Sequence, residues 1–330
     1  MPIADVLMVD SSPTQADPGL AQREPPLSRE VEVSPGISLA CVKPEIAERV
    51  MAATGFRASS PRHRTAMYAF VRYDPPGREW DSDHEITKLL FLSHFVRANE
   101  AGFEYSARIV TAKTGDLTSI EPANVAPPFA RAYCLAGARG LWLTQADAVT
   151  LRDLGAAYKR VYPLLTKSRV GVAVSAFAGT PFILFENQVA LLLATILEGL
   201  VSTMPQRASR QFATRVPDLA REVELPELDR AWAEKTYSLR SKLAHGGPRL
   251  PSVGSPDRAI KTLELDETIA KLDELLRRIL RKALLDDAFR GRVESIETRL
   301  PVPGVGCPTC RSTDDTLIPV RCPSCQGSWR

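Results

Sequence analysis

The sequence predicts a mainly α-helical protein in which a helical bundle follows a mixed α/β region and precedes a small C-terminal module. Between residues 143 and 286, apolar side chains recur at helical spacing in one segment after another. Before residue 140, helical spacing alternates with short runs of β-branched and aromatic residues. Four of the six cysteines stand at or after position 307. At 330 residues, the chain is long enough for two domains with tails.

Composition and charge are those of a globular protein. Hydrophobic residues make up 44% of the chain and charged residues 25%. The formal net charge of +3 is too small to argue by itself for a polyanionic partner. No apolar run approaches the roughly 18 residues that span a bilayer, so we expect no membrane partner. The N-terminal stretch MPIADVLMVDSSPTQ lacks the basic start and apolar core of a signal peptide, which predicts a cytoplasmic protein with reduced thiols.

The N-terminal part of the chain is expected to contain two regions. Residues 1–36 are rich in Pro, Ser and acidic residues without a sustained period, which predicts a disordered leader. Residues 37–140 predict a mixed α/β accessory region, in which no known catalytic motif stands out. Its expected elements are a short helix at 44–51, a strand at 65–74, a helix beginning at Asp83 and a strand at 104–112.

Residues 143–290 predict a helical domain. Thr144 is expected to cap a helix whose apolar side chains share one face, namely Ala148, Leu151, Leu154 and Tyr158. Residues 170–180 are apolar and ambiguous, with a helix favoured. Four further helices are expected at 186–202, at 208–223 with a kink or restart at Pro217, at 226–245, and at 263–286. Consecutive helices with apolar stripes are typical of a bundle.

The last predicted helix combines an apolar stripe with a run of cations. The stripe consists of Leu265, Ile269, Leu272, Leu276, Ile279 and Ala283. The run RRILRK occupies residues 277–282, and a second basic set consists of Arg207, Arg210, Arg215 and Arg221. Such runs usually mark a solvated face, and an RNA-guiding stripe is the alternative.

The segment YSLRSKLAHGG, residues 237–247, carries the residues best suited to chemistry. Arg240 offers a permanently charged fork of donors for a phosphate or a developing oxyanion. His245 lies in the last turn of its helix, where exposed carbonyl ends favour a protonated imidazole that suits a general acid or base. Five residues separate the two, so they point roughly 140° apart on a straight helix. An ordinary role as helix caps or ion-pair partners is the alternative.

This segment resembles the R-x4-H signature of the HEPN superfamily, and specifically its Apea-like branch. The stretch LLLATILEGLVS, residues 191–202, is similar to that family's apolar central helix with an embedded acid, here Glu198. The stretch SRQFATRV, residues 209–216, is similar to its next helix, which carries an aromatic residue between basic ones. The resemblance covers roughly residues 143–286 in the same order.

The resemblance implies a helical bundle that commonly dimerises and so joins two R-x4-H segments in one composite site. Many members are metal-independent endoribonucleases of defence, toxin–antitoxin or RNA-processing systems. Arg240 and His245 would then be the catalytic pair, with Glu198 as a supporting residue, and RNA would be the partner. In active nucleases the residue after the arginine is often Asn or Asp, whereas this chain has Ser241. A non-catalytic dimerisation scaffold therefore stays open as the alternative.

The C-terminal cysteines predict a structural metal site. Cys307, Cys310, Cys322 and Cys325 form a C-x2-C-x11-C-x2-C pattern, in which two pairs of thiolates match a closed tetrahedral Zn²⁺ site. Two disulfides and a redox C-x-x-C are the alternatives, and neither suits a reducing compartment without a thioredoxin-like context. Residues 301–330 therefore predict a module that resembles a zinc ribbon, with a partner protein or nucleic acid at its surface.

Overall fold

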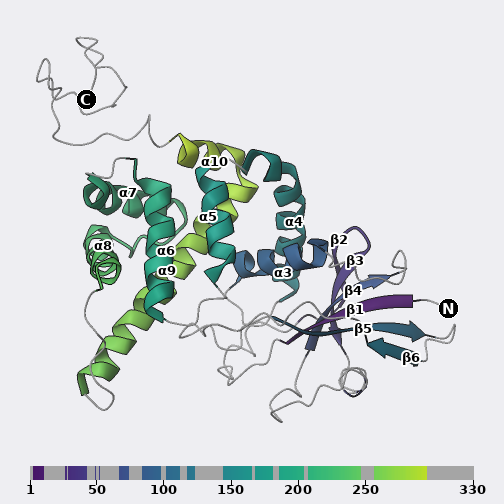
Figure 1. The fold of residues 1–330 in the computed structure, drawn as a ribbon. Coiled ribbons are helices and arrows are strands. Elements are labelled where there is room, and N and C mark those ends of the chain that lie inside the picture. Colours follow the sequence, from purple (N-terminus) through teal and green to yellow (C-terminus); the bar gives the residue numbers. More distant parts are fainter. Residues whose placement is uncertain are drawn as a thin grey trace, which may run out of the picture.

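The computed structural model describes residues 3–10, 27, 29–42, 49, 52, 67–73, 84–97, 102–111, 117–122, 144–165, 168–180, 186–203, 207–246 and 256–295. These residues form a mainly helical protein with an antiparallel sheet at one side of a helical bundle (Figure 1). The strands are β1 (Ile3–Asp10), β2 (Val31–Ser34), β3 (Ile37–Val42), β4 (Met67–Tyr73), β5 (Gly102–Thr111) and β6 (Leu117–Pro122). The helices are α3 (His84–Val96), α4 (Gln145–Leu165), α5 (Arg169–Ala178), α6 (Glu186–Val201), α7 (Ala208–Glu222), α8 (Arg230–Ala244), α9 (Pro256–Leu285) and α10 (Asp287–Glu294).

The first strand lies inside the sheet, where a disordered leader was expected. The strand order is β2-β3-β4-β1-β5-β6, so β1 pairs with β4 on one side and β5 on the other. Val6 lies opposite Val71 and Ala107 in these two antiparallel ladders. The prediction of a disordered leader over residues 1–36 is therefore wrong at β1 and β2. The short apolar run of β1 is stabilised by pairing with strands far along the chain, which local composition does not reveal.

Three other expectations for the first half are confirmed. The strands predicted at 65–74 and 104–112 are β4 and β5, and the helix predicted from Asp83 is α3. The helix predicted at 44–51 lies almost wholly outside the described residues. Strands β1 and β2, which lie before the predicted start of the accessory region at residue 37, belong to the same sheet as β4 and β5.

Helix α4 joins the sheet to the bundle. Its start is a reciprocal cap, because the Asp147 amide donates to Thr144 Oγ1 at 3.2 Å and the Thr144 amide donates to the Asp147 carboxylate at 2.8 Å. Arg97, just after α3, forms an ion pair with the same carboxylate at 2.9 Å. At the other side, Lys159 donates to Ser34 Oγ of β2 at 3.3 Å. The capping role predicted for Thr144 is confirmed.

The bundle follows the predicted order with shifted ends. Residues 170–180 form α5 as far as Ala178, and α7 continues through the buried Pro217 without a restart. Helix α8 begins at Arg230, four residues after the predicted start, because Asp229 caps it by accepting the Trp232 amide at 2.9 Å. Helix α9 is longer than predicted, and the short α10 was not predicted at all.

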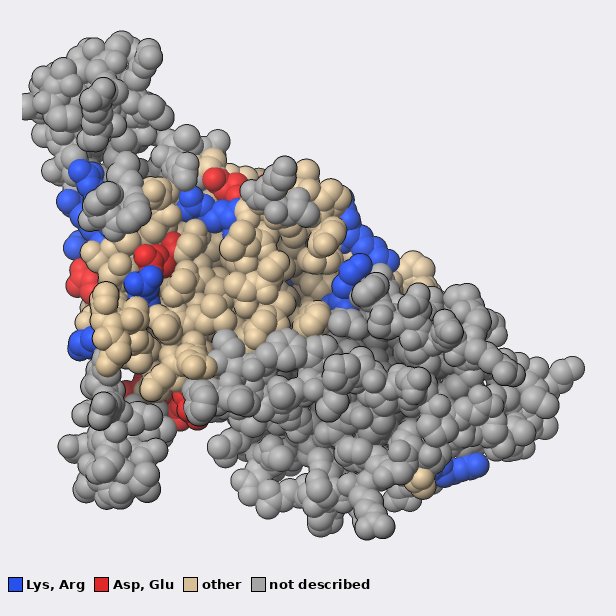
Figure 2. All heavy atoms as spheres, viewed as in Figure 1, with Lys and Arg blue, Asp and Glu red and all other residues tan. Residues whose placement is uncertain are grey.

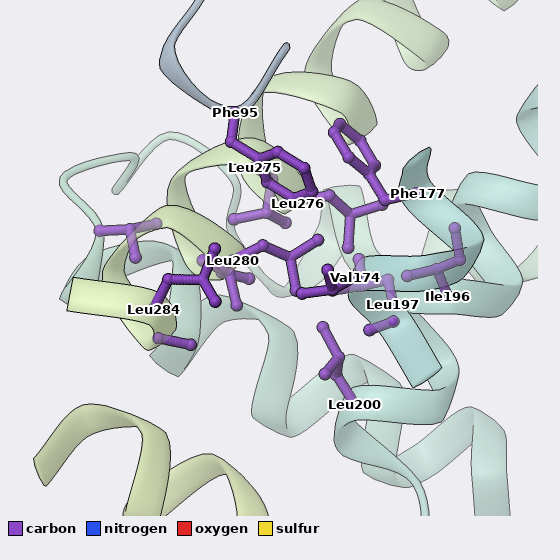
Figure 3. Close-up of a cluster of buried hydrophobic side chains, with 14 of the residues drawn as sticks. Phe95, Val174, Phe177, Ile196, Leu197, Leu200, Leu275, Leu276, Leu280 and Leu284 are labelled. Carbon is purple, nitrogen blue, oxygen red and sulfur yellow. The ribbon is translucent and has the colours of Figure 1, made fainter. Parts of the chain in front are cut away.

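The core forms where α3, α5, α6 and α9 meet (Figure 3). Phe95 of α3 packs on Phe177 of α5 with ring centroids 5.2 Å apart. The predicted α9 stripe is confirmed, since all six of its residues are buried. Side chains labelled in the close-up are Phe95, Val174, Phe177, Ile196, Leu197, Leu200, Leu275, Leu276, Leu280 and Leu284. Burial of each such side chain stabilises the fold by about 1.5–3 kcal/mol, so these contacts hold α3, α5, α6 and α9 together.

The Glu294 side chain of α10 caps the N-terminus of α5. Its two carboxylate oxygens accept the Arg169 amide at 2.9 Å and the Val170 amide at 2.8 Å, where the helix dipole favours a negative charge. We expect Glu294→Gln to lower the free energy of unfolding by about 0.5–2 kcal/mol, measured in urea. The control is Glu222→Gln, whose exposed 2.6 Å pair with Arg292 should contribute less than about 1 kcal/mol. Equal losses in the two variants would contradict this role of Glu294.

Candidate functional site

Arg240 and Glu198 form an ion pair between α8 and α6. Arg240 Nη2 lies 2.8 Å from Glu198 Oε2, and the side chains are 25% and 17% exposed. Helix α6 carries Glu198 on a partly covered position beside its buried apolar face, and α8 packs against that helix. The structure therefore brings Glu198, expected only as a supporting residue, next to the arginine of the R-x4-H segment.

An aromatic pair lines the same cluster. The Tyr237 ring lies 5.9 Å from Arg240 Cζ, and its centroid is 5.4 Å from that of Phe212 in α7. Burial raises the pKa of Tyr237, the Glu198 carboxylate raises it further, and Arg240 opposes both. Phe212 is the aromatic residue of the stretch SRQFATRV, whereas the sequence pattern assigned no role to Tyr237. Tyr237 stands one helical turn before Arg240, and that spacing was the available signal.

The ion pair leaves hydrogen-bonding capacity unused. Within the described residues, the buried Arg240 Nε and Glu198 Oε2 have no hydrogen-bond partner. The 2.8 Å distance from Arg240 Nη2 to Glu198 Oε2 is that of an ion pair, but the angles at this contact are not those of a hydrogen bond. The guanidinium is held by charge and by the Tyr237 ring, and its Nε–H stays buried without an acceptor among the described residues.

His245 lies outside this cluster. It is the C-cap of α8, it is exposed, and its amide donates to the Ser241 carbonyl at 3.2 Å. Gly246, with a φ of 71°, then ends the helix in a conformation that favours glycine. In the described part of the chain, His245 forms no ion pair with Glu198. The structure therefore brings Arg240 to Glu198, while His245 faces outward, as the roughly 140° separation along the helix predicts.

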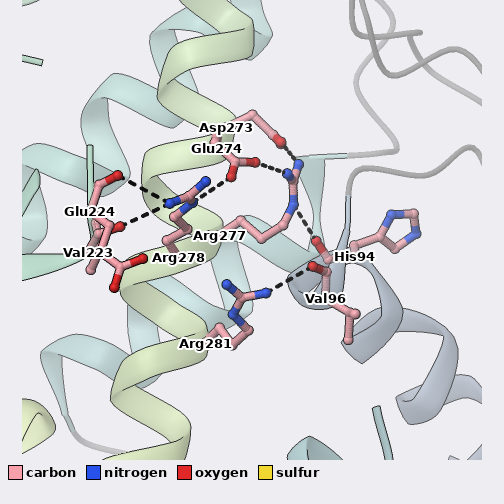
Figure 4. Close-up of polar contacts among 9 residues, drawn as sticks. All are labelled: His94, Val96, Val223, Glu224, Asp273, Glu274, Arg277, Arg278 and Arg281. Atoms are coloured by element: carbon pink, nitrogen blue, oxygen red, sulfur yellow. Dashed lines mark hydrogen bonds and ion pairs between the residues drawn. The ribbon is translucent and has the colours of Figure 1, made fainter. Parts of the chain in front are cut away.

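The cations of 277–282 bind acceptors within the chain, as Figure 4 shows for the three arginines, although only Arg277 is buried. Arg277 and Arg281 donate to the carbonyls of His94 at 2.8 Å and Val96 at 3.1 Å, at the end of α3. Arg278 donates to Val223 at 3.2 Å, and Lys282 donates to Glu222 at 2.6 Å, at the end of α7. The last carbonyls of a helix lack intrahelical donors and carry partial negative charge, so α9 supplies the cations that both ends require.

Two of the other arginines are also committed to contacts within the chain. Arg215 is buried and donates to the Val201 carbonyl at 2.5 Å, at the end of α6. Arg221 pairs with Asp218 at 2.5 Å on the surface of α7. On the face shown in Figure 2, the described Lys and Arg side chains lie in separate groups around a largely uncharged centre. The basic sets singled out in the sequence therefore do not form one basic surface there.

The cysteines of the predicted zinc module, Cys307, Cys310, Cys322 and Cys325, lie outside the described residues. Within the described ranges, no three His, Cys, Asp or Glu side chains gather in a group that would hold a metal ion. The metal prediction therefore rests on the cysteine spacing alone.

Comparisons with protein-family models, curated proteins and solved structures find no match for this chain. The HEPN resemblance stays a prediction that rests on the residues quoted for it. Among the helices of the described residues, none combines the length and the apolar character needed to cross a membrane.

Proposed function

We propose that this chain is a HEPN-type RNA-binding protein and metal-independent endoribonuclease, built around Arg240 and His245 with Glu198 in support. The observation that carries the proposal is the Arg240–Glu198 ion pair, which fixes a partly exposed guanidinium on α8. The same helix ends in an exposed histidine. A fixed cation and an accessible acid–base group meet the chemical needs of phosphodiester cleavage without a metal.

In the proposed reaction, His245 accepts the proton of an RNA 2′-hydroxyl, whose oxygen attacks the adjacent phosphorus. The bond from phosphorus to the 5′-oxygen breaks, and a protonated histidine supplies the proton to that leaving oxygen. Arg240 stabilises the charge on the phosphorane-like transition state. The products are a 2′,3′-cyclic phosphate and a 5′-hydroxyl. Roles in defence, toxin–antitoxin systems or RNA processing belong to the same proposal.

The proposed active form is a homodimer joined through the helical domain. On one chain, Arg240 turns toward α6 while His245 faces outward, so the pair does not converge on one phosphate. A second chain placed beside the His245 end of α8 supplies the complementary residue and leaves the outward face of that helix open. The proposal further includes a cytoplasmic location and a structural Zn²⁺ bound by Cys307, Cys310, Cys322 and Cys325. Four thiolates leave that ion no open position, so it takes no part in cleavage.

The decisive experiment is cleavage of mixed RNA by the purified full-length protein in EDTA. We expect wild type to cut natural RNA and to leave 2′-O-methyl RNA intact, since the methyl group removes the nucleophile. His245→Ala should lower the cleavage rate by about 10²-fold or more, because it removes the acid–base group. Lys88→Ala, an exposed change on α3, serves as the control and should cut at the wild-type rate. Equal cleavage by wild type and His245→Ala, or none by either on any RNA, would contradict the proposal.

A non-catalytic scaffold is the second candidate function, favoured by one observation. The Arg240–Glu198 pair is largely shielded and bridges α8 to α6, as a structural contact would. In that case Arg240→Ala lowers stability or dimerisation and removes no activity. Thermal unfolding and sedimentation of Arg240→Ala beside the cleavage assay separate the two functions. A loss of cleavage by a folded dimer favours the enzyme.

A further inference from the structure

The outward face of α8 carries one continuous exposed stripe. Its residues recur every three or four positions and are all exposed, namely Ala231, Lys235, Ser238, Lys242 and His245. The two lysines lie two helical turns apart, about 10 Å along the axis. Between them stands Ser238, whose small side chain lets another backbone approach the helix closely. The stripe ends at the proposed catalytic histidine.

The charges along this stripe are not neutralised within the described residues. Lys235 and Lys242 form no ion pair there, unlike the cations of α9. Glu234, next to Lys235 in the chain, is paired with Arg230 at 2.8 Å, and Glu267 of α9 is paired with Lys271 at 2.6 Å. The hydrogen bond from Lys271 is the main cause of the lowered pKa of Glu267, and the charge of Lys235 adds to it. Lys235 therefore lies near α9, and the stripe itself carries two cations and no acid.

We propose that the Lys235–Lys242 stripe binds the phosphate backbone of single-stranded RNA and leads it to His245. This inference rests on the proposed function and names the surface through which that function meets its substrate. Charge complementarity selects a polyanion, because two unpaired ammonium groups flank a small, uncharged residue. Apart from His245 at its end, the stripe carries no aromatic side chain on which a base would stack, so its lysines contact the backbone without sequence preference.

Salt-dependent binding of labelled 2′-O-methyl RNA to the full-length protein tests this inference without cleavage. We expect Lys235→Ala/Lys242→Ala to weaken binding about tenfold at low salt. Two lost phosphate contacts at about 0.7 each should also reduce the slope of log affinity against log salt by about 1.4. The charge-keeping Lys235→Arg/Lys242→Arg should bind as wild type does. The control pair Lys88→Ala/Arg152→Ala removes two exposed cations elsewhere and should leave the slope unchanged.

The outcomes separate this inference from the nuclease proposal. If Lys235→Ala/Lys242→Ala binds RNA with the affinity and salt slope of wild type, the stripe is not the RNA-binding surface, and the nuclease proposal is unaffected. If Lys88→Ala/Arg152→Ala weakens RNA binding equally, the proposed role of the stripe is also overturned, since any exposed cation would then attract RNA to the same extent. If polyglutamate of matched charge displaces the RNA as well as unlabelled RNA does, the partner is an acidic protein and the RNA assignment is overturned. Absence of RNA binding by wild type overturns the proposed function and the stripe together.

Discussion

Arg277→Met is expected to lower the free energy of unfolding by about 3–5 kcal/mol, a loss typical of removing one partner of a buried charge pair. Arg277 is 4% exposed in α9 and pairs with the equally buried Asp273. It also contacts Glu274 at 2.6 Å and donates to the His94 carbonyl at 2.8 Å (Figure 4). Without the guanidinium, the Asp273 carboxylate stays buried without its counter-charge, and the end of α3 loses a donor.

Two further variants isolate the cause of that loss. Asp273→Leu/Arg277→Met removes both charges and should recover most of the lost stability, because apolar residues replace a buried pair at little cost. Arg278→Met, one position along, removes a more exposed arginine and should cost about 1 kcal/mol. Urea unfolding midpoints and slopes measure all three. A double variant no more stable than Arg277→Met would contradict the charge-burial argument.

Acid is expected to destabilise the α3–α9 contact through His94. Desolvation by burial, with a smaller effect of the Arg277 charge, lowers the pKa of His94 from its ordinary 6.5 to about 4. Between those values the unfolded chain binds a proton that the native protein does not, so stability falls as the pH drops through this window. The full effect approaches about 3 kcal/mol as an upper value, since His94 keeps some contact with solvent.

His94→Gln is the variant that measures this effect, because it keeps a polar side chain that does not titrate. From about pH 7 to about pH 5, wild type should lose up to about 2 kcal/mol more than His94→Gln. Urea unfolding of both proteins at each pH gives the difference. Parallel pH profiles of the two proteins would show that His94 does not titrate as its surroundings predict. Arg277→Met should narrow the difference, since it removes the charge that helps to lower the pKa.

Local signals predicted most of the helical half. Thr144 caps α4, and the α9 stripe from Leu265 to Ala283 is buried as its spacing requires. Both the cap and the apolar stripe depend on residues within a few positions of the helix that they define. The start of α8 was misplaced because Pro226 and Asp229 are both acceptable helix starts in sequence, and the side-chain cap to Trp232 selects the second.

The candidate site was predictable only in part. The resemblance named Arg240, Glu198 and His245, and the structure places the first two 2.8 Å apart. It included Phe212 as the aromatic residue of the stretch 209–216, but it did not indicate that this ring meets Tyr237 across α7 and α8. Nor did it show that Lys235 and Lys242 are exposed while Arg215 and Arg277 bind carbonyls within the chain. Exposure depends on which face of a helix its neighbours cover.

The helical periods, the caps and the apolar stripes of this protein follow from local sequence, since each depends on residues one or two turns apart. The place of β1 follows from tertiary pairing, because its partners β4 and β5 lie far along the chain. It also decided the role of the α9 cations, whose acceptors are backbone carbonyls at the ends of α3 and α7. Every residue carries such a carbonyl, so no side-chain pattern marks those that need a cation, and they become recognisable only when the helices have packed.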